Sequence, residues 1–241
     1  MTKDAIAFGP RLVGTPTGKL RAAVLIRPTV SLENARSMPG ESGAVFARAL
    51  AQHEILRTTL EYFGVEIIVA ETAGGDPHDC AACDAAVVFE DGALIARPTA
   101  MSRRGSADRM QAEFARIDVP IAGHIAAPGL FDGGDVLLVD RTAFVGNGAR
   151  GNAIGRAGFG NVAQAHGYRV IEVPLAEGVT SLRSVASAVA KDTVVVADGA
   201  IDLRAFHGFK TIVFDRGEDM AAGVLTLGER HVIADVRYRT A

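Results

Sequence analysis

Three absences narrow the classes of protein to which this sequence of 241 residues can belong. It has only two cysteines, which are too few for a disulfide framework and fit a reducing compartment. No apolar run reaches the roughly 18 residues of a membrane span, and the first residues lack the pattern of a signal or transit peptide. The net charge is only -3, and the basic residues are scattered, so there is no electrostatic reason to expect nucleic acid. We therefore expect a cytoplasmic protein that binds small molecules, with no nucleic acid or membrane partner.

What is present is a recurring pattern of short apolar runs around tight turns. The turns fall at residues 16–18, 91–92, 140–141, 191–192 and 228–229, which predicts five β-hairpins. The second, third and fourth turns are about 50 residues apart, a period typical of repeated supersecondary units. Between the hairpins, the apolar spacing predicts helices over 42–63, 106–117, 152–166 and 201–206, each followed by an apolar strand.

This order of elements predicts an α/β fold in which a hairpin, a helix and a strand repeat four times. Repeats of this kind arranged in a ring would form an α/β propeller with a central pocket. The fifth hairpin is followed by no helix and no strand, so we expect a truncated last unit. We expect one domain over 1–241, with 1–19 as an N-terminal extension. The edge left open by the last unit would be covered by residues 1–18 or by a second subunit, so we expect a homo-oligomer.

The first predicted helix is the clearest. Its apolar residues are expected to form one broad face toward the core, namely Val45, Phe46, Ala49, Ile55, Leu56, Leu60 and Phe63, with Gly64 as the stop signal. The predicted helix over 106–117 places Met110, Phe114 and Ile117 inward. The predicted helix over 152–166 has Asn152 as its N-cap.

One stretch combines acids and glycines directly before an apolar hairpin. Asp132, Gly133, Gly134 and Asp135 precede the hairpin, and Arg150 follows it. A carboxylate beside flexible backbone at the mouth of a strand is a plausible cation site. The alternative is a simple turn, in which the glycines adopt positive φ and Asp132 caps backbone amides. Arg150 could likewise cap carbonyl groups of the hairpin.

Four strings together resemble dimethylarginine dimethylaminohydrolases, within the pentein superfamily of arginine-modifying enzymes. They are "ALIARPTAMSRRG", "APGLFDGGDVLLV", "FVGNGARGN" and "HGYRVIEVPLAEGVTSLRS", and the resemblance runs from about Leu20 to Ala234. It implies a pentein propeller. It also implies hydrolysis of a guanidinium group, in which a cysteine thiolate attacks the guanidinium carbon and a histidine protonates the departing amine. Water then releases a ureido product.

The resemblance also implies roles for particular residues. Asp132 and Asp84 take the places of the carboxylates that hold the guanidinium, and paired oxygens suit its planar donors. Arg103 and Arg150 match the pair that grips the α-carboxylate of the substrate. Ser181 stands where the family has its general-acid histidine, and a hydroxyl does not titrate near neutral pH as an imidazole does.

The nucleophile implied by the resemblance is a cysteine near the C-terminus, whereas no cysteine follows Cys83 in this sequence. Cys83 adjoins Asp84, but alternation along a strand would send the two side chains to opposite faces, so we expect the thiol to pack as a small hydrophobic group. His78, Cys80 and Cys83 form only half of a zinc ligand set. We expect no metal and no cofactor. Alternatively, Arg103 and Arg104 could be solvent-exposed residues just before a helix.

Three hypotheses follow. The first is a non-catalytic homologue that binds a guanidinium or amino-acid-like ligand, or that acts in regulation. The second is an active amidinohydrolase of dimethylargininase type that uses an unrecognised nucleophile. The third is a structural or interaction protein on the same ring, because a fold can outlive its activity.

Overall fold

The structure is a computed structural model that describes residues 12–35, 43–72, 75–215, 221–228, 230–235 and 237. Most of the predicted N-terminal extension, residues 1–11, lies outside this range, as do Ser42 at the start of the first predicted helix and Glu229 of the fifth predicted turn. Among the described residues, no helix is both long and apolar enough to cross a membrane.

Within the described residues, five small sheets make up the β-structure, and three of them share one plan. In each of these three sheets, two strands form an antiparallel hairpin, and a helical segment leads from the second strand to a third strand that lies parallel to it. Their strands are β3 (Ala86–Val88), β4 (Ala93–Ile95) and β5 (Ile121–His124); β6 (Val136–Val139), β7 (Thr142–Asn147) and β8 (Arg169–Pro174); and β9 (Ala186–Ala190), β10 (Thr193–Ala197) and β11 (Lys210–Phe214). The remaining two sheets are the parallel pair β1 (Ala22–Ile26) and β2 (Glu66–Ala70), and the hairpin β12 (Leu225–Gly228) and β13 (His231–Ile233).

The connecting helices follow the predicted pattern closely. They are α1 (Phe46–Tyr62), α2 (Arg104–Arg116), α3 (Ala153–Ala165), α4 (Leu182–Val185) and the 3-10 segments η1 (Val30–Asn34), η2 (Ala82–Asp84), η3 (Met101–Arg103), η4 (Gly133–Asp135) and η5 (Leu203–Phe206). Asn152 caps α3 as predicted, since its side chain accepts a hydrogen bond from the Gly155 amide at 2.8 Å. The predicted fourth helix is only the 3-10 turn η5.

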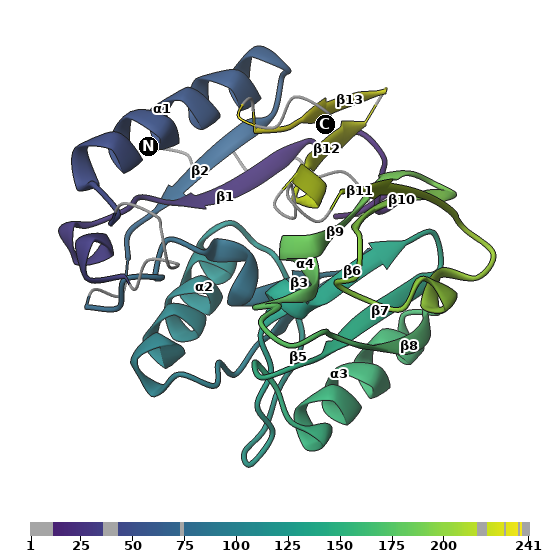
Figure 1. Cartoon of the computed structure of the whole chain (residues 1–241). Helices are drawn as coiled ribbons and strands as arrows, with labels where there is room; N and C mark the ends of the chain where they lie inside the picture. The colour runs from purple at the N-terminus through teal and green to yellow at the C-terminus, as the bar shows by residue number, and fades with distance from the viewer. Residues whose placement is uncertain are drawn as a thin grey trace.

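The sheets contact one another in chain order, as a ring requires. β1 lies against η2 at the start of the second sheet, η2 against η4 at the start of the third, β6 against β9, and β9 against β12. The Leu20 amide donates to the Leu227 carbonyl at 2.9 Å, which joins the segment just before β1 to β12. Figure 1 shows β12 and β13 beside β1, with α1, α2 and α3 on the outside of their sheets. The fold is therefore the pentein-type α/β arrangement expected from the sequence.

The first predicted hairpin is wrong. A turn does form at residues 15–18, closed by a hydrogen bond from the Gly18 amide to the Thr15 carbonyl, but no strand is described before it. The neighbours of the β1 segment are instead the parallel strand β2 and, through Leu20, β12. Local turn residues predict a turn, whereas the partner of a strand depends on contacts with distant residues.

The edge of the last hairpin, which was predicted to be open, is covered by the first unit. One apolar cluster contains Leu60 from α1, Val65 before β2 and Leu227 from β12. It also takes in partly buried residues of β1, β2, β12 and β13, namely Ala23, Leu25, Ile67, Leu225 and Ile233. A second subunit is therefore not needed to cover this edge, and the homo-oligomer stays a prediction.

The buried stripe of α1 is narrower than predicted. Leu60 is fully buried and Leu56 packs beside it, but Ile55 is 65% exposed and Val45 is also exposed. A two-stranded sheet is narrow, so it covers only part of the apolar face that the sequence predicts for this helix. For α2 the prediction is confirmed, since Met110, Phe114 and the following Ile117 are all buried.

Candidate functional site

Four of the site residues predicted from the sequence meet in one buried cluster. Asp84 ends η2, Arg103 ends η3, Asp132 immediately precedes η4, and Arg150 lies in the turn between β7 and α3. The contact between η2 and η4 brings Asp84 and Asp132 together, although they are 48 positions apart in the sequence. We call Asp84, Arg103, Asp132 and Arg150 the acid-arginine cluster.

Ion pairs connect all four members of the acid-arginine cluster. The Arg103 guanidinium donates from Nη2 to Asp84 Oδ2 at 2.9 Å and from Nη1 to Asp132 Oδ2 at 3.3 Å. Arg150 Nη1 donates to Asp84 Oδ2 at 2.7 Å and lies 3.6 Å from Asp132 Oδ2. The other oxygen of Asp132, Oδ1, is buried and has no hydrogen-bond partner within the described residues, and the same holds for Arg103 Nε. The cluster thus retains polar atoms that could take a further partner.

The glycines of the "DGGD" string allow η4 to approach η2 closely. A Cβ at residue 134 would lie 2.1 Å from Asp84 Oδ1, and one at residue 133 would lie 2.3 Å from the Cys83 carbonyl oxygen. Neither glycine has positive φ, and the Asp132 side chain makes no capping hydrogen bond. The part of the simple-turn interpretation that required positive φ at these glycines is therefore wrong, and the glycines instead allow close packing around a carboxylate.

Burial raises the pKa of both acids of the "DGGD" string. It raises the pKa of Asp132, as does the nearby Asp84, while Arg103 and Arg150 act in the opposite direction. Burial also raises the pKa of Asp135 to about 6. Asp135 Oδ1 accepts a hydrogen bond from the Leu182 amide at 2.9 Å, which ties η4 to the first residue of α4.

A second acidic turn, which sequence reasoning missed, anchors the segment that carries Arg103. Ser102 Oγ donates to Asp76 Oδ2 at 2.5 Å, and Ser106 Oγ donates to Asp79 Oδ1 at 2.6 Å. Both aspartates are buried. These two bonds bracket Arg103 on either side and fix the start of α2, so the arginine is held against the carboxylates. The signal in the sequence was two serines four residues apart at the start of a helix, which place both hydroxyls on one face.

Arg103 is accordingly not a solvated approach to the helix, since its side chain is only 6% exposed. Arg150, at 29%, is the most exposed member of the acid-arginine cluster. Burial lowers the pKa of Arg150, but Asp84 and Asp132 raise it by more, so the net shift is upward. Arg150 donates to Asp84 rather than capping carbonyl groups of the hairpin.

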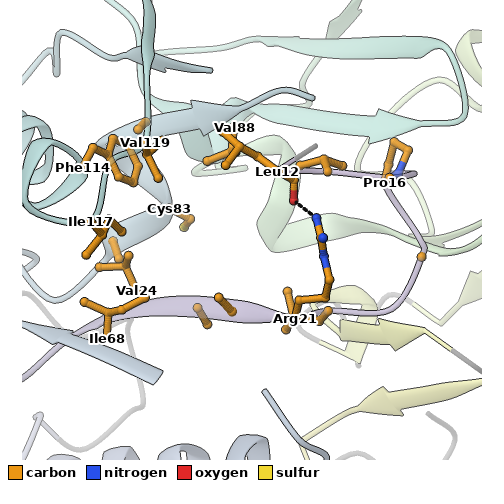
Figure 2. Close-up of a pocket in the computed structure, with 18 of the residues that line it drawn as sticks. Leu12, Pro16, Arg21, Val24, Ile68, Cys83, Val88, Phe114, Ile117 and Val119 are labelled. Carbon is orange, nitrogen blue, oxygen red and sulfur yellow. Dashed lines mark hydrogen bonds between the residues drawn. The ribbon is translucent and has the colours of Figure 1, made fainter. Parts of the chain in front are cut away.

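A cavity of about 380 Å³ has Cys83, the neighbour of Asp84, in its lining, but no member of the acid-arginine cluster. Its wall is mainly apolar and comes from β1, β2, β3 and α2, as Figure 2 shows with Val24, Ile68, Val88 and Phe114. Residues 12–16 of the N-terminal segment form part of its wall, and Arg21 Nη2 donates to the Leu12 carbonyl at 2.7 Å. A smaller cavity of about 310 Å³ continues between β6, β9 and β12 and shares part of this wall.

Cys83 lines both cavities, contrary to the prediction. Residues 82–84 form the 3-10 turn η2, so the strand alternation from which its orientation was inferred does not apply. The thiol is accessible from the cavity, and its Sγ lies 3.7 Å from Asp84 Oδ1. Although the side chain is exposed to the cavity, partial desolvation by the surrounding protein raises the pKa of the thiol, and Asp84 raises it further.

Ser181 is the N-cap of α4, which contacts η4, and its side chain makes no capping bond. Ser181 is buried, and its carbonyl accepts a hydrogen bond from Ser184 Oγ at 2.7 Å. The structure connects it to the cluster only indirectly, through the Leu182 amide on Asp135. No group of three His, Cys, Asp or Glu side chains suited to a metal ion occurs in the described part of the chain.

Comparisons with known proteins give a consistent pattern. No family model matches the chain. An N(G),N(G)-dimethylarginine dimethylaminohydrolase of Streptomyces coelicolor is 35% identical over 147 residues, which are 61% of this chain and 56% of that protein. The alignment therefore spans little more than half the length of this relative. The enzyme of the same name from Pseudomonas aeruginosa is 26% identical over 188 residues, 78% of this chain and 74% of that protein.

A solved structure shows the same fold. The structure of a mutant dimethylarginine dimethylaminohydrolase from Pseudomonas aeruginosa, in complex with citrulline, superposes with a TM-score of 0.82 at 24% identity and covers 90% of this chain and 85% of its own. The ring of repeated units, the matching strings and these relatives agree. This chain is therefore similar in sequence to dimethylarginine dimethylaminohydrolases and shares their fold.

Proposed function

We propose that the acid-arginine cluster binds a small guanidinium or amidinium compound of the arginine-derivative class, and that this chain does not cleave it. The observation that carries the proposal is the pair of buried carboxylates, Asp84 and Asp132, whose Oδ2 atoms share the same two guanidinium groups. A site that accommodates guanidinium groups between two carboxylates has the charge and the paired acceptors that such a ligand needs. The citrulline in the Pseudomonas structure is the ureido counterpart of arginine.

The proposal that cleavage does not occur rests on the groups near the cluster. The cysteines of the chain are Cys80 and Cys83, and burial raises the pKa of each thiol, which lowers the fraction of nucleophilic thiolate at neutral pH. Ser181 takes the place of the general acid implied by the resemblance, and its hydroxyl does not protonate a departing amine as an imidazolium does.

Binding is tested by calorimetry with Nω-methyl-L-arginine and with citrulline as an uncharged analogue. We expect the charged ligand to bind more tightly, and Asp132→Asn to weaken it by roughly thirtyfold or more, because the variant removes one partner of a buried charge pair. Asp108→Asn, at an exposed position on α2, is the control with the same change in charge. Equal binding of both ligands, or undiminished affinity in Asp132→Asn, would remove the cluster from the site.

One observation favours a second candidate, an active amidinohydrolase. Cys83 opens into the cavity directly beside Asp84, so its sulfur is within reach of a guanidinium carbon held there. Mass spectrometry of the protein incubated with Nω-methyl-L-arginine distinguishes the two functions. Ureido product that disappears in Cys83→Ser would establish hydrolysis and overturn the non-catalytic proposal. Bound but unchanged ligand would support it.

A further inference from the structure

The two arginines of the acid-arginine cluster are held very differently. Arg103 is almost completely buried, and the hydrogen bonds from Ser102 to Asp76 and from Ser106 to Asp79 fix the backbone on both sides of it. Arg150 lies in the turn after β7, and its side chain is 29% exposed. Only Arg150 can therefore leave the carboxylates by a rotation of its side chain toward solvent, without unfolding a helix start.

Arg150 is also the arginine whose contacts a ligand would imitate. Its Nη1 lies between the two carboxylates, 2.7 Å from Asp84 Oδ2 and 3.6 Å from Asp132 Oδ2. A ligand guanidinium held by both carboxylates would need this same position. Asp132 Oδ1, buried and without a partner in the described residues, is a further acceptor that the chain's own arginines leave unused.

We propose that Arg150 determines the specificity of the site by occupying the place of the ligand guanidinium, so that a ligand must displace it. This inference rests on the proposed function and names the residue that controls it. Arg103 and Arg150 already place two guanidinium groups against the two carboxylates, so a bare cation that enters beside Arg150 brings a further positive charge with no carboxylate of its own to pair with. A ligand with its own carboxylate adds no net charge. Arg150 thus disfavours simple guanidinium cations.

The test is a gain of binding, which a merely structural arginine would not produce. Methylguanidinium binding is measured by calorimetry for the wild type, Arg150→Gln and Arg150→Lys. In Arg150→Gln we expect affinity for methylguanidinium to rise by roughly tenfold or more, because no side-chain cation competes for Asp84 and Asp132. In Arg150→Lys the cation is restored, so we expect affinity to return toward that of the wild type.

The control is Arg141→Gln, which removes an arginine from the β6–β7 turn of the same hairpin with the same change in net charge. Arg141 pairs with Glu90 at 2.6 Å and is 52% exposed, so we expect its replacement to leave methylguanidinium binding unchanged. Thermal unfolding of each variant shows that it is folded. An Arg150→Gln protein that is folded and binds methylguanidinium no more tightly than the wild type overturns the inference. So does an equal gain in Arg141→Gln.

Nω-methyl-L-arginine, measured on the wild type in parallel, separates this inference from the proposed function. If the wild type binds it and Arg150→Gln gains affinity for methylguanidinium, both stand. If the wild type binds it and the variant gains nothing, only the displacement inference fails. If the wild type does not bind it but the variant gains affinity for methylguanidinium, the inference is supported and the proposed ligand class fails. If neither protein binds either compound, both are overturned.

Discussion

The close approach of η4 to η2 makes Gly134→Ala the sharpest test of the site geometry. A Cβ at this position would lie 2.1 Å from Asp84 Oδ1, whereas real Cβ contacts are not found below 3.0 Å. The Asp84 carboxylate would have to move by roughly 1 Å, since the interior is too closely packed to absorb the clash elsewhere. Its bonds from Arg103 at 2.9 Å and from Arg150 at 2.7 Å to Oδ2 would then lengthen or break.

The size of the effect follows from two costs. Overpacking a buried position costs about 1–3 kcal/mol. Breaking a buried ion pair costs about 3–5 kcal/mol when one partner is lost, and a displaced but still present carboxylate loses part of this. We therefore expect Gly134→Ala to lower the free energy of unfolding by about 2–4 kcal/mol. We also expect it to weaken binding of Nω-methyl-L-arginine.

Urea denaturation at neutral pH measures the stability change, and calorimetry measures the binding. The matched control is Gly160→Ala in α3, a buried glycine at which a Cβ would meet nothing within 4 Å. Alanine is the better helix former, so the control should be stabilised by about 0.5–1 kcal/mol. The reasoning is refuted if Gly134→Ala is as stable as the wild type and binds the ligand equally well.

Three further predictions concern other parts of the molecule. Because burial raises the pKa of Asp135 to about 6 in the folded protein, the stability it contributes is present at low pH and is lost as the pH rises from about 4 through 6. In Asp135→Asn, the change in the free energy of unfolding between pH 4 and pH 6 should be smaller by roughly 2–3 kcal/mol, as measured by urea denaturation at each pH. The same dependence on pH in the variant and the wild type would contradict this prediction. Leu60→Ala should lower the free energy of unfolding by about 3 kcal/mol in the same assay, because Leu60 is fully buried where α1 meets β12. Ile55→Ala, on the exposed side of α1, should change it by less than about 0.5 kcal/mol. At pH 8, Cys83 should react with iodoacetamide more slowly than a free cysteine does, because its pKa is raised. The reaction should be faster in Asp84→Asn, and mass spectrometry follows both rates. Rapid alkylation of the wild type would refute the raised pKa.

The structure also explains why the repeated units could be predicted. The hairpins at 91–92, 140–141 and 191–192 and the helices α2 and α3 all depend on residues close together in the sequence. Turn residues, apolar periodicity and the Asn152 cap act within a few positions. The local pattern indicated Asp132 and Arg150, but Asp84 and Arg103 could be assigned to the same site only from the resemblance, because nothing local indicates that Asp84 and Asp132 would meet.

The amino-acid sequence by itself therefore determined the repeating hairpin, helix and strand, and the types of residue available for the proposed guanidinium site. The tertiary structure decided three other features. It joined Leu20 to Leu227, placed Cys83 in the cavity wall and set Arg150 on the carboxylates that a ligand would need. Each of these features depends on contacts between distant segments. The packing of the whole ring sets the geometry of those contacts, and local propensity carries no information about that geometry.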